Sequence, residues 1–471
     1  MTPEEFRRAG HELIDWIADY RANVESRPVM SRVLPGEIRA SLPTTPPEAP
    51  EPFAAILRDV DDKVLPGLSH WQHPRFFGYF PSNGELSSVL GDFLSTGLGV
   101  LGLSWQSSPA LSELEEVVCD WMRQLLGLSE GFSGVIQDTA STSTLVALIC
   151  ARERSQGYAL ANDGLQGKGP HLVVYTSAQS HSSVEKAALL AGFGRNHVRR
   201  IAVDDRYAML PSALDEAIAQ DLAQGLLPCA LVATTGTTTT TAMDPLSPLA
   251  ERARAHGMWL HVDAAMAGSA MLLPECRHLW EGIEGADSLV VNAHKWLGVA
   301  FDCSLYYVRS PEHLVRVMST NPSYLQSSVD DRVKNLRDWG IPLGRRFRAL
   351  KLWCLIREQG VSGLQRRLRR DLANAAWLDG AVRARPDFRV LAPVVLQTVC
   401  IRHEPAGLSG DELDRHTLAW ADRLNRSGAA YITPAVLDGR WMVRVSVGSG
   451  TTERSHVEAL WQAIQATVEG D

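Results

Sequence analysis

The chain has 471 residues, which is enough for two or three domains with a substantial core. Its 45% hydrophobic and 21% charged content is ordinary for a folded protein, and its net charge of −8 argues against a general nucleic-acid binder. The one local basic run, residues 366–370, is short and fits an exposed helix face.

The first segment predicts a capped helix. Thr2 can serve as the N-cap, Pro3 fits the first turn and Glu5 completes a capping box. The apolar face of this helix must pack on a partner, and consists of Phe6, Leu13, Ile14 and Ile17. The proline-rich residues 27–50 predict an extended connector. No basic stretch followed by an apolar core is seen here, and no segment reaches the length of a membrane span.

The cysteines are dispersed, without the Cys-x-x-Cys spacing of a metal or redox motif. An odd number of scattered cysteines in a chain of this length predicts reduced thiols. We therefore expect a soluble, cytoplasmic protein that holds no metal ion.

From about residue 110 to 310, short apolar strands alternate with amphipathic helices. The predicted strands are 134–137, 171–176, 230–234, 258–262, 288–291 and 304–308, and helices are expected over 141–154, 183–190 and 246–256. This alternation predicts an α/β fold with a mostly parallel sheet, whose active site lies at the carboxyl ends of the strands.

Beyond residue 345 the pattern changes to that of a smaller α+β domain. Helices are expected over 346–358, 363–381 and 453–468, and strands over 388–391, 397–402, 430–433 and 441–446. The polar residues 321–338 between the two domains are either a linker or a lid, and we favour a lid because long connections of this kind are often functional.

Two features follow the early strands of the sheet. Residues 139–144 place small and hydroxyl side chains at a helix start, where free backbone N–H groups can hold a phosphate. His181 ends the next strand, where its ring can stack on an aromatic group. Each feature also has a simpler structural explanation, namely an N-cap and a structural histidine.

Two further features follow the later strands. Asp263 ends an apolar strand, and a buried carboxylate needs a partner such as a pyridinium N–H, although it can also cap a helix. Ala265 is small enough for a flat ring to lie on the backbone. Lys295 follows the next strand, and a lysine in apolar surroundings becomes a nucleophile toward an aldehyde. Together the four features match the needs of pyridoxal phosphate.

Longer motifs carry a resemblance over nearly the whole chain. They are His73-Pro74, Gly78-Tyr79-Phe80-Pro81, Ser104-Trp105, Ser108-Pro109-Ala110, Gly134-Val135-Ile136-Gln137, residues 181–185, residues 261–265, His294-Lys295-Trp296 and residues 341–348. The sequence resembles the group II pyridoxal-phosphate decarboxylases, and among them the aromatic-L-amino-acid (DOPA) decarboxylases.

The resemblance implies a fold-type I homodimer with its active site at the subunit interface. Such an enzyme has a mostly parallel seven-stranded sheet between helices. The implied domains are an N-terminal helical segment 1–80 packed across the dimer, a large cofactor domain 81–345 with a mobile catalytic loop 320–340, and a small C-terminal α+β domain 346–471. Neither nucleic acid nor membrane is implied as a partner.

The resemblance also implies roles for individual residues. The catalytic set is Lys295, His181, Tyr324 and Asp263, in which Lys295 carries the cofactor and Tyr324 returns a proton to Cα. The cofactor-binding set is Ala140, Ser141, His181, Thr238, Asp263, Ala265, Asn292, His294 and Lys295. The substrate set is Tyr79, Phe80, Pro81, Ser82, Leu101, Leu103, His181 and Gly344.

Some positions depart from the animal enzymes. Those enzymes have phenylalanine at Leu103, tyrosine at Met266 and threonine at Ser82, so the preferred aromatic substrate is open. Gly344 matches a glycine that accompanies larger indolic substrates in plant relatives.

We expect decarboxylation of an aromatic L-amino acid (L-DOPA, L-tryptophan, 5-hydroxytryptophan, phenylalanine or tyrosine) to its amine and carbon dioxide. The alternatives are an aromatic aldehyde synthase, a decarboxylase of another amino acid such as histidine or glutamate, and an inactive binding protein. Tyr324 favours plain decarboxylation over aldehyde formation.

Two other motifs are rejected. Residues 97–102 satisfy Gly-x-Gly-x-x-Gly but do not follow a clear strand, which argues against a dinucleotide site. His181, His261 and His294 lack the short spacing of zinc ligands.

Overall fold

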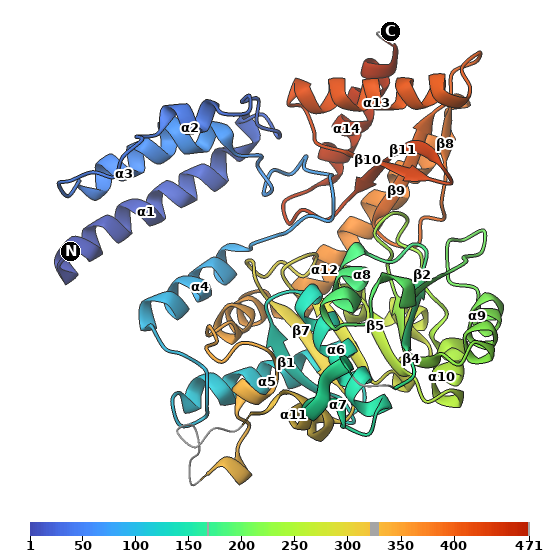
Figure 1. Ribbon diagram of the computed structural model, residues 1–471. Coiled ribbons are helices and arrows are strands. Elements are labelled where there is room, and N and C mark those ends of the chain that lie inside the picture. Colours follow the sequence, from blue (N-terminus) through green and yellow to red (C-terminus); the bar gives the residue numbers. More distant parts are fainter. Residues whose placement is uncertain (167–168, 321–328, 470–471) are drawn as a thin grey trace. The chain divides into compact units, whose positions relative to one another are not determined.

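The computed structural model describes residues 1–166, 169–320 and 329–469, which form two compact units (Figure 1). The first unit consists of residues 1–81, 374–391 and 399–471, and the second of residues 82–373 and 392–398. Across the described residues, no helix has both the length and the apolar content needed to cross a membrane.

The second unit is built around a seven-stranded sheet with the order β1-β7-β6-β5-β4-β2-β3. Neighbours from β6 to β3 are parallel, and β7 runs antiparallel between β6 and β1. The strands are β1 Ser133–Gln137, β2 Leu172–Ser177, β3 Val198–Ile201, β4 Leu227–Thr234, β5 Trp259–Asp263, β6 Ser288–Asn292 and β7 Ser304–Val308. The predicted α/β fold with a mostly parallel sheet is confirmed.

The sequence analysis missed one strand of this sheet, β3. Its four residues show no clear apolar pattern, because the two middle residues are Arg199 and Arg200. As an edge strand it needs no apolar run, and Arg199 instead forms an ion pair with Asp221 at 2.5 Å. The hydroxyl of Tyr175 on β2 also donates to Asp221, at 2.8 Å.

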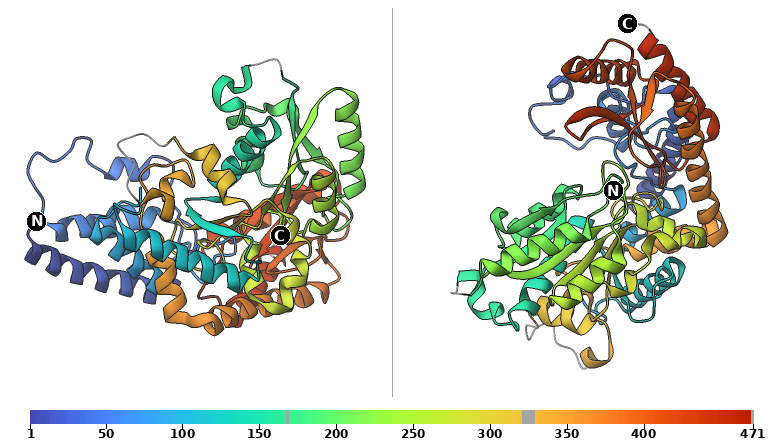
Figure 2. Two further views of the ribbon diagram at one scale, coloured as in Figure 1. Left: turned by 90° about the horizontal axis from the view of Figure 1, so that it is seen from below. Right: turned by 90° about the vertical axis from the view of Figure 1, so that its right-hand side faces the viewer.

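The inner strands form the core of this unit. Every residue of β2, β5, β6 and β7 is buried, as expected for strands covered by helices. Helices surround the sheet in Figures 1 and 2, and α6 contacts β1 as well as the four strands from β4 to β7. The helices are α4 Leu86–Leu98, α5 Pro109–Leu126, α6 Ala140–Ser155, α7 Leu160–Asp163, α8 Ser182–Leu190, α9 Pro211–Ala223, α10 Leu246–Ala255 and α11 Pro311–Met318.

The glycine-rich residues 97–102 close a helix. Helix α4 ends at Leu98, and its C-cap Gly99 has φ +65°, a left-handed conformation that favours glycine. The motif therefore forms the end of a helix and does not follow a strand, which argues against a dinucleotide fingerprint.

The first unit begins with α1 Pro3–Asn23, α2 Glu37–Ser41 and α3 Phe53–Asp59. The predicted capping box is present, since Thr2 Oγ1 accepts from Glu5 N at 3.2 Å and Thr2 N donates to Glu5 Oε2 at 2.6 Å. The prediction that residues 27–50 are extended is wrong at α2, because Glu37 Oε2 accepts from Leu34 N at 2.8 Å and stabilises a short helix.

The small sheet has the order β10-β11-β9-β8 and is antiparallel where its pairing is recorded. Its strands and helices are β8 Phe388–Val390, β9 Thr398–His403, β10 Thr433–Leu437, β11 Arg440–Ser446, α12 Ala349–Arg383, α13 Gly410–Ser427 and α14 Arg454–Glu469. Gly360, at φ +61° and ψ 169°, interrupts α12 between the two helices expected there.

The strand predicted at 430–433 is placed too early. The backbone of Ile432 is held by the Asn425 side chain, which accepts its N–H at 2.9 Å and donates to its carbonyl at 3.0 Å. This side chain replaces ladder hydrogen bonds, so β10 starts at Thr433. Pro434 is tolerated because β10 is an edge strand.

A buried ion pair joins Arg345, which follows the strands of the large sheet in the chain, to helix α5. Arg345 Nη2 lies 2.7 Å from Glu115 Oε1, and both side chains are buried. The same Glu115 oxygen accepts from Ile136 N at 2.9 Å, and Arg345 also donates to the Ile136 carbonyl. The pair therefore fixes β1 as well as α5.

We predict that Arg345→Met lowers the free energy of unfolding by about 3–5 kcal/mol, because it leaves the Glu115 carboxylate buried without its cation. Urea denaturation of the variant and the wild type measures the loss. The double variant Glu115→Leu with Arg345→Met is the matched control, and should be less destabilised than Arg345→Met alone. Equal or greater destabilisation of the double variant would contradict this explanation.

His261 on β5 is a neutral histidine in the core. Its Nδ1 lies 2.8 Å from Ser288 Oγ and its Nε2 lies 3.3 Å from Thr144 Oγ1. Burial lowers the pKa of His261 from 6.5 to about 4, against the opposing effect of Asp263.

The unfolded chain binds a proton at this histidine below pH 6.5, whereas the folded chain resists it until about pH 4. The stabilisation is therefore complete above pH 6.5 and is lost as the pH falls toward 4, by about 3 kcal/mol in all. We predict that His261→Gln flattens the curve of unfolding free energy against pH over this interval. Parallel curves for variant and wild type would refute the assignment.

Candidate active site

The expected site residues follow strands that end at one edge of the large sheet. Thr139 follows β1, His181 follows β2, Thr238 follows β4, Asp263 ends β5 and Lys295 follows β6. β2, β4, β5 and β6 are parallel, and two successive antiparallel pairings give β1 the same direction. The carboxyl ends of all five strands therefore share one edge, as the sequence predicts.

Asp263 occupies the middle of this edge. It pairs with Thr234 on β4 and with Val290 on β6, and only 5% of its surface is exposed. Its Oδ1 accepts the backbone N–H of Ala265 at 3.0 Å, which turns the chain away from the strand. A nearly buried carboxylate at a strand end is costly unless a cationic or N–H partner meets it.

His181 lies within electrostatic reach of Asp263 and Lys295. Partial desolvation lowers the pKa of His181, while the Asp263 carboxylate raises it and the Lys295 amine lowers it. The ring is fixed at the start of α8, because its Nδ1 accepts from Ser183 N at 3.2 Å and lies 2.8 Å from Ser183 Oγ. The structure thus brings together three residues that are far apart in sequence.

Lys295 sits in a tight turn after β6. Its N–H donates to the Asn292 carbonyl at 3.0 Å, and its own carbonyl accepts from Gly298 N at 3.3 Å. Asn83 Nδ2 also donates to this carbonyl, at 3.2 Å. The lysine backbone is therefore held from both sides, while its side chain is half-buried.

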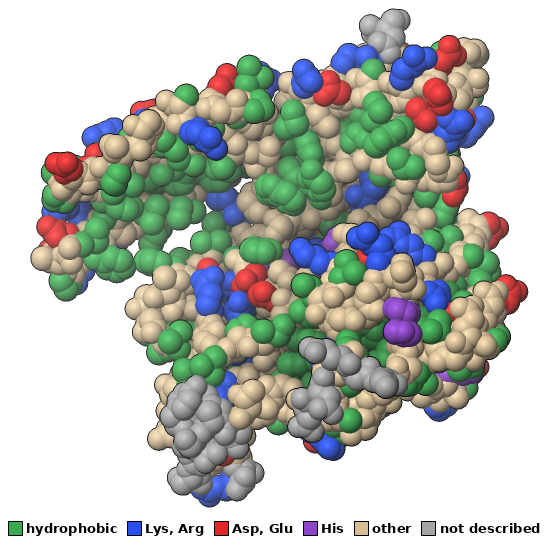
Figure 3. All heavy atoms as spheres, viewed as in Figure 1, with side chains coloured by type: hydrophobic (Ala, Val, Ile, Leu, Met, Phe, Trp, Pro, Cys, Tyr) green, Lys and Arg blue, Asp and Glu red, His purple; other side chains and the backbone are tan. Residues whose placement is uncertain are grey.

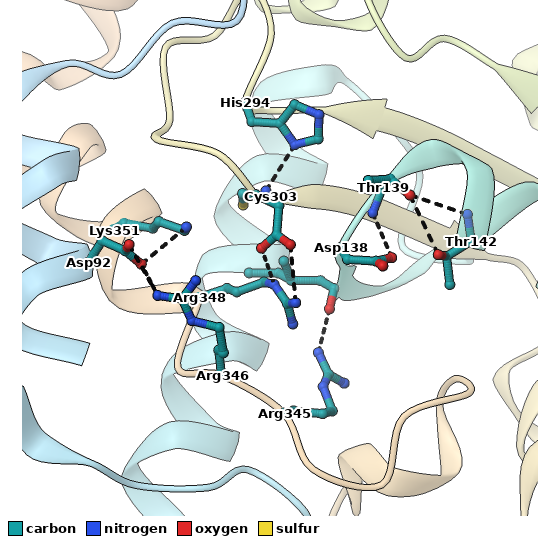
Figure 4. A network of polar contacts seen from close by, with 12 residues as sticks. Asp92, Asp138, Thr139, Thr142, His294, Cys303, Arg345, Arg346, Arg348 and Lys351 are labelled. Atoms are coloured by element: carbon teal, nitrogen blue, oxygen red, sulfur yellow. Dashed lines mark hydrogen bonds and ion pairs between the residues drawn. The ribbon is translucent and has the colours of Figure 1, made fainter. Parts of the chain in front are cut away.

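His294 supports the same turn. Its Nδ1 accepts from Cys303 N at 2.9 Å, as Figure 4 shows, and its backbone carbonyl accepts from Ser82 Oγ at 3.0 Å. Burial and, to a lesser extent, the adjacent Lys295 lower the pKa of His294 to about 4. The ring is therefore neutral and carries its proton on Nε2.

Figure 4 also shows the start of α6, with Asp138, Thr139 and Thr142. Thr139 is its N-cap and accepts from Thr142 N at 3.5 Å, while its own N–H donates to Asp138 Oδ1 at 2.7 Å. Ala140 is buried and Ser141 is exposed. The first N–H groups of a helix have no partner within the helix, so this turn can bind an anion.

Asn292 and Thr238 complete the expected cofactor residues. Asn292 is buried, its backbone N–H donates to the Ala265 carbonyl at 2.9 Å, and its Oδ1 accepts from Ser304 Oγ at 2.6 Å. The bond to Ala265 joins the backbone after β5 to β6, and the bond from Ser304 joins β6 to β7. Thr238 is half-buried in the turn after β4, which Thr237 Oγ1 stabilises by accepting from Ala242 N at 3.0 Å.

These residues fit pyridoxal phosphate. The cofactor needs an amine for its aldehyde, an acid for its ring nitrogen, a flat neighbour for its ring and N–H donors for its phosphate. Lys295, Asp263, His181 and the start of α6 offer these groups along one edge. Ala265 leaves space beside Asp263 because it carries only a methyl group.

The expected substrate residues are distributed differently. Ser82 contacts the carbonyl of His294, but Leu101 and Gly344 are exposed and Leu103 is half-buried in the same unit. Tyr79, Phe80 and Pro81 belong to the other compact unit. Tyr324 lies outside the described residues.

Three residues of the site escaped the sequence analysis. Asn83 holds the Lys295 carbonyl, Ser304 holds the Asn292 side chain, and the backbone of Cys303 fixes the His294 ring. Asn83 lies two residues beyond the Gly78–Pro81 motif, and this proximity could have marked it as a site residue. No feature of the sequence marks Ser304 or Cys303, because the residues that they contact belong to β6 and to the turn after it.

The chain is similar to a known protein family and to individual known proteins. The model of the pyridoxal-dependent decarboxylase conserved domain matches residues 35–404. Tyrosine decarboxylase 4 of Petroselinum crispum is 41% identical over 99% of this chain and 93% of its own length. Phenylacetaldehyde synthase of Arabidopsis thaliana is 40% identical over 99% of this chain and 96% of its own.

The structure also resembles a solved enzyme with a bound cofactor. The crystal structure of Oryza sativa tryptophan decarboxylase with pyridoxal phosphate and tryptamine has a TM-score of 0.96 and 36% identity, and the match covers 100% of this chain and 99% of that one. With the site geometry, these matches show that the chain belongs to the pyridoxal-dependent decarboxylase family, enzymes that use pyridoxal 5'-phosphate.

Proposed function

We propose that this protein decarboxylates an aromatic L-amino acid to its aryl-alkylamine and carbon dioxide. The observation that carries the proposal is the grouping of Asp263, His181 and Lys295 at the carboxyl edge of the sheet. The relatives named as tyrosine and tryptophan decarboxylases support an aromatic substrate.

The cofactor would be held by residues from four strand ends. Ala140, Ser141, Thr238 and Asn292 would contact the phosphate, and Ala265 and His294 would line the ring and the lysine turn. When bound, pyridoxal phosphate supplies a sink for the electrons of the broken Cα–carboxylate bond.

The protein groups would orient the substrate and handle protons. The Asp263 carboxylate would hold the proton on the ring nitrogen, and His181 would stack on the ring close to the substrate carboxylate. The Lys295 amine would be the covalent attachment point that the substrate amine displaces. Tyr324 would return a proton to Cα.

The substrate ring would be contacted by Tyr79, Phe80, Pro81 and Ser82, and by Leu101, Leu103 and Gly344. We propose that Leu101 and Leu103 come from the second subunit of a homodimer. The domains would be an N-terminal segment 1–80 packed across that dimer, a cofactor domain 81–345 with a catalytic loop 320–340, and a C-terminal domain 346–471. The enzyme would work in the cytoplasm, without nucleic acid or membrane.

An exposed apolar stripe supports the homodimer. Leu86, Leu90, Leu94 and Leu98 recur every four residues along α4, so they share one face, and all are exposed. In the other unit, no residue of α1 is buried, and Phe6 and Ile14 on its predicted apolar face are exposed. Figure 3 shows apolar side chains exposed on the N-terminal helical segment. Apolar faces of this extent commonly mark protein interfaces.

We predict that Lys295→Ala lowers kcat for amine formation by about 10³-fold or more, because no other amine takes its place. It should also remove the visible absorbance of the cofactor-loaded protein. Lys186→Ala, at an exposed position of α8, is the matched control.

Product analysis by mass spectrometry decides between the candidate reactions. Amine without hydrogen peroxide from a panel of L-amino acids supports decarboxylation. Stoichiometric peroxide with aldehyde would establish the reaction of the phenylacetaldehyde synthase relative instead. Undiminished turnover by Lys295→Ala would refute the assignment of the lysine.

We predict that Leu94→Asp shifts the protein from dimer to monomer, because it places a charge in the apolar face of α4. Sedimentation velocity measures the change, and loss of decarboxylation should accompany it if the active site needs both subunits. The control is Leu190→Asp, which changes an exposed leucine on α8. A stable dimer in Leu94→Asp would place the interface elsewhere.

A further inference from the structure

The segment that carries Tyr79 is held between two stretches of the C-terminal half of its own unit. Phe77 N donates to the Tyr431 carbonyl at 2.8 Å, and Tyr431 N donates to the Arg75 carbonyl at 3.1 Å. On the other side, Ser446 N donates to the Phe77 carbonyl at 2.9 Å. Backbone hydrogen bonds therefore fix the conformation of the residues that precede Tyr79.

Tyr79 itself has a strained backbone. Its φ of +52° is left-handed, which costs a residue other than glycine about 1–3 kcal/mol. Thr433 Oγ1 offsets this cost by accepting the Tyr79 N–H at 2.7 Å. A Cβ on Gly78 would lie 2.3 Å from the Tyr431 ring, so the ring packs directly on the backbone before Tyr79. Strain that the surroundings maintain is typical of functional positions.

The Tyr79 ring contacts two aromatic side chains. It stacks on Trp71 with centroids 5.5 Å apart and planes at 12°, and meets the Tyr431 ring at 5.7 Å and 34°. The Tyr431 hydroxyl donates to Tyr79 Oη at 3.1 Å. Burial and this hydrogen bond raise the pKa of the Tyr431 hydroxyl well above its ordinary value, so it remains a donor.

This bond decides what the Tyr79 hydroxyl can do. Because Tyr431 donates to it, the hydrogen of Tyr79 is left for a different acceptor. Among the described residues of this unit, Tyr79 Oη has no second hydrogen-bond partner, and 47% of the Tyr79 surface is exposed. A phenolic oxygen on a bound ring can accept this hydrogen, whereas an unsubstituted phenyl ring or an indole N–H offers no such lone pair.

We infer that Tyr431 is a positioning residue that fixes the Tyr79 hydroxyl as a donor, so that the enzyme favours aromatic amino acids with a hydroxyl group on the ring. The inference rests on the proposed function, in which Tyr79 contacts the substrate. It names the substrate class within that function and assigns Tyr431 a role in specificity.

The test compares matched substrates on the cofactor-loaded enzyme. In Tyr431→Phe, the ratio of kcat/KM for L-tyrosine to that for L-phenylalanine should fall about fivefold, the value of one neutral hydrogen bond, mainly through KM. The ratio for 5-hydroxytryptophan over L-tryptophan should fall in the same direction. Adding Tyr431→Phe to Tyr79→Phe should lower neither ratio further, since Tyr431 acts through Tyr79.

Tyr20→Phe is the matched control, because it removes another hydroxyl of the same unit, one that lies 2.8 Å from His70 Nδ1. It should leave both ratios at their wild-type values. Equal losses for hydroxylated and unsubstituted rings in Tyr431→Phe would overturn the inference. If Tyr431→Phe does not fold, Tyr79→Phe provides the test. An unchanged ratio of kcat/KM values in Tyr79→Phe would overturn the inference. A wild-type enzyme that converts none of these substrates would instead refute the proposed function.

Discussion

The candidate site depends on the parallel pairing of β4, β5 and β6. This pairing sets Asp263 level with Thr234 and Val290, and the turn after β6 then carries Lys295 to the same edge. A carboxylate and an amine from strands that are adjacent in space thereby face His181 from a third. The hydrogen bond from Asn292 N to the Ala265 carbonyl, 2.9 Å, ties the two strand ends together. A slip in register would separate the acid from the amine.

The sequence was most informative where chemistry and local pattern coincide. Six of the seven strands of the large sheet were predictable. So were the capped first helix and the order of the site residues along the sheet edge. Each of these depends on residues close together in the chain. β3 was missed because Arg199 pairs with Asp221, which lies on α9. The start of β10 was misplaced because the Asn425 side chain occupies the backbone of Ile432. Both errors come from side chains on neighbouring helices, Asp221 on α9 and Asn425 on α13, which the residue pattern of a strand alone does not contain.

The same limit applies to the site itself. The resemblance to a decarboxylase family indicated Lys295 and Asp263, but the contacts that hold the lysine turn come from Asn83, Cys303 and the Ser82 hydroxyl. Likewise, a sequence motif marked Tyr79, whereas its left-handed backbone and its bond to Tyr431 appear only in the fold. The chemistry of this enzyme is thus visible in its motifs, and its positioning and selectivity in contacts between segments far apart in sequence.

The central claim is that one lysine anchors the cofactor. Borohydride reduction of the protein loaded with pyridoxal phosphate fixes the cofactor on whichever amine it is bonded to, and peptide mass spectrometry then locates it. We expect a single phosphopyridoxyl group, on Lys295. A label on another lysine, or no label in a catalytically active preparation, would contradict it.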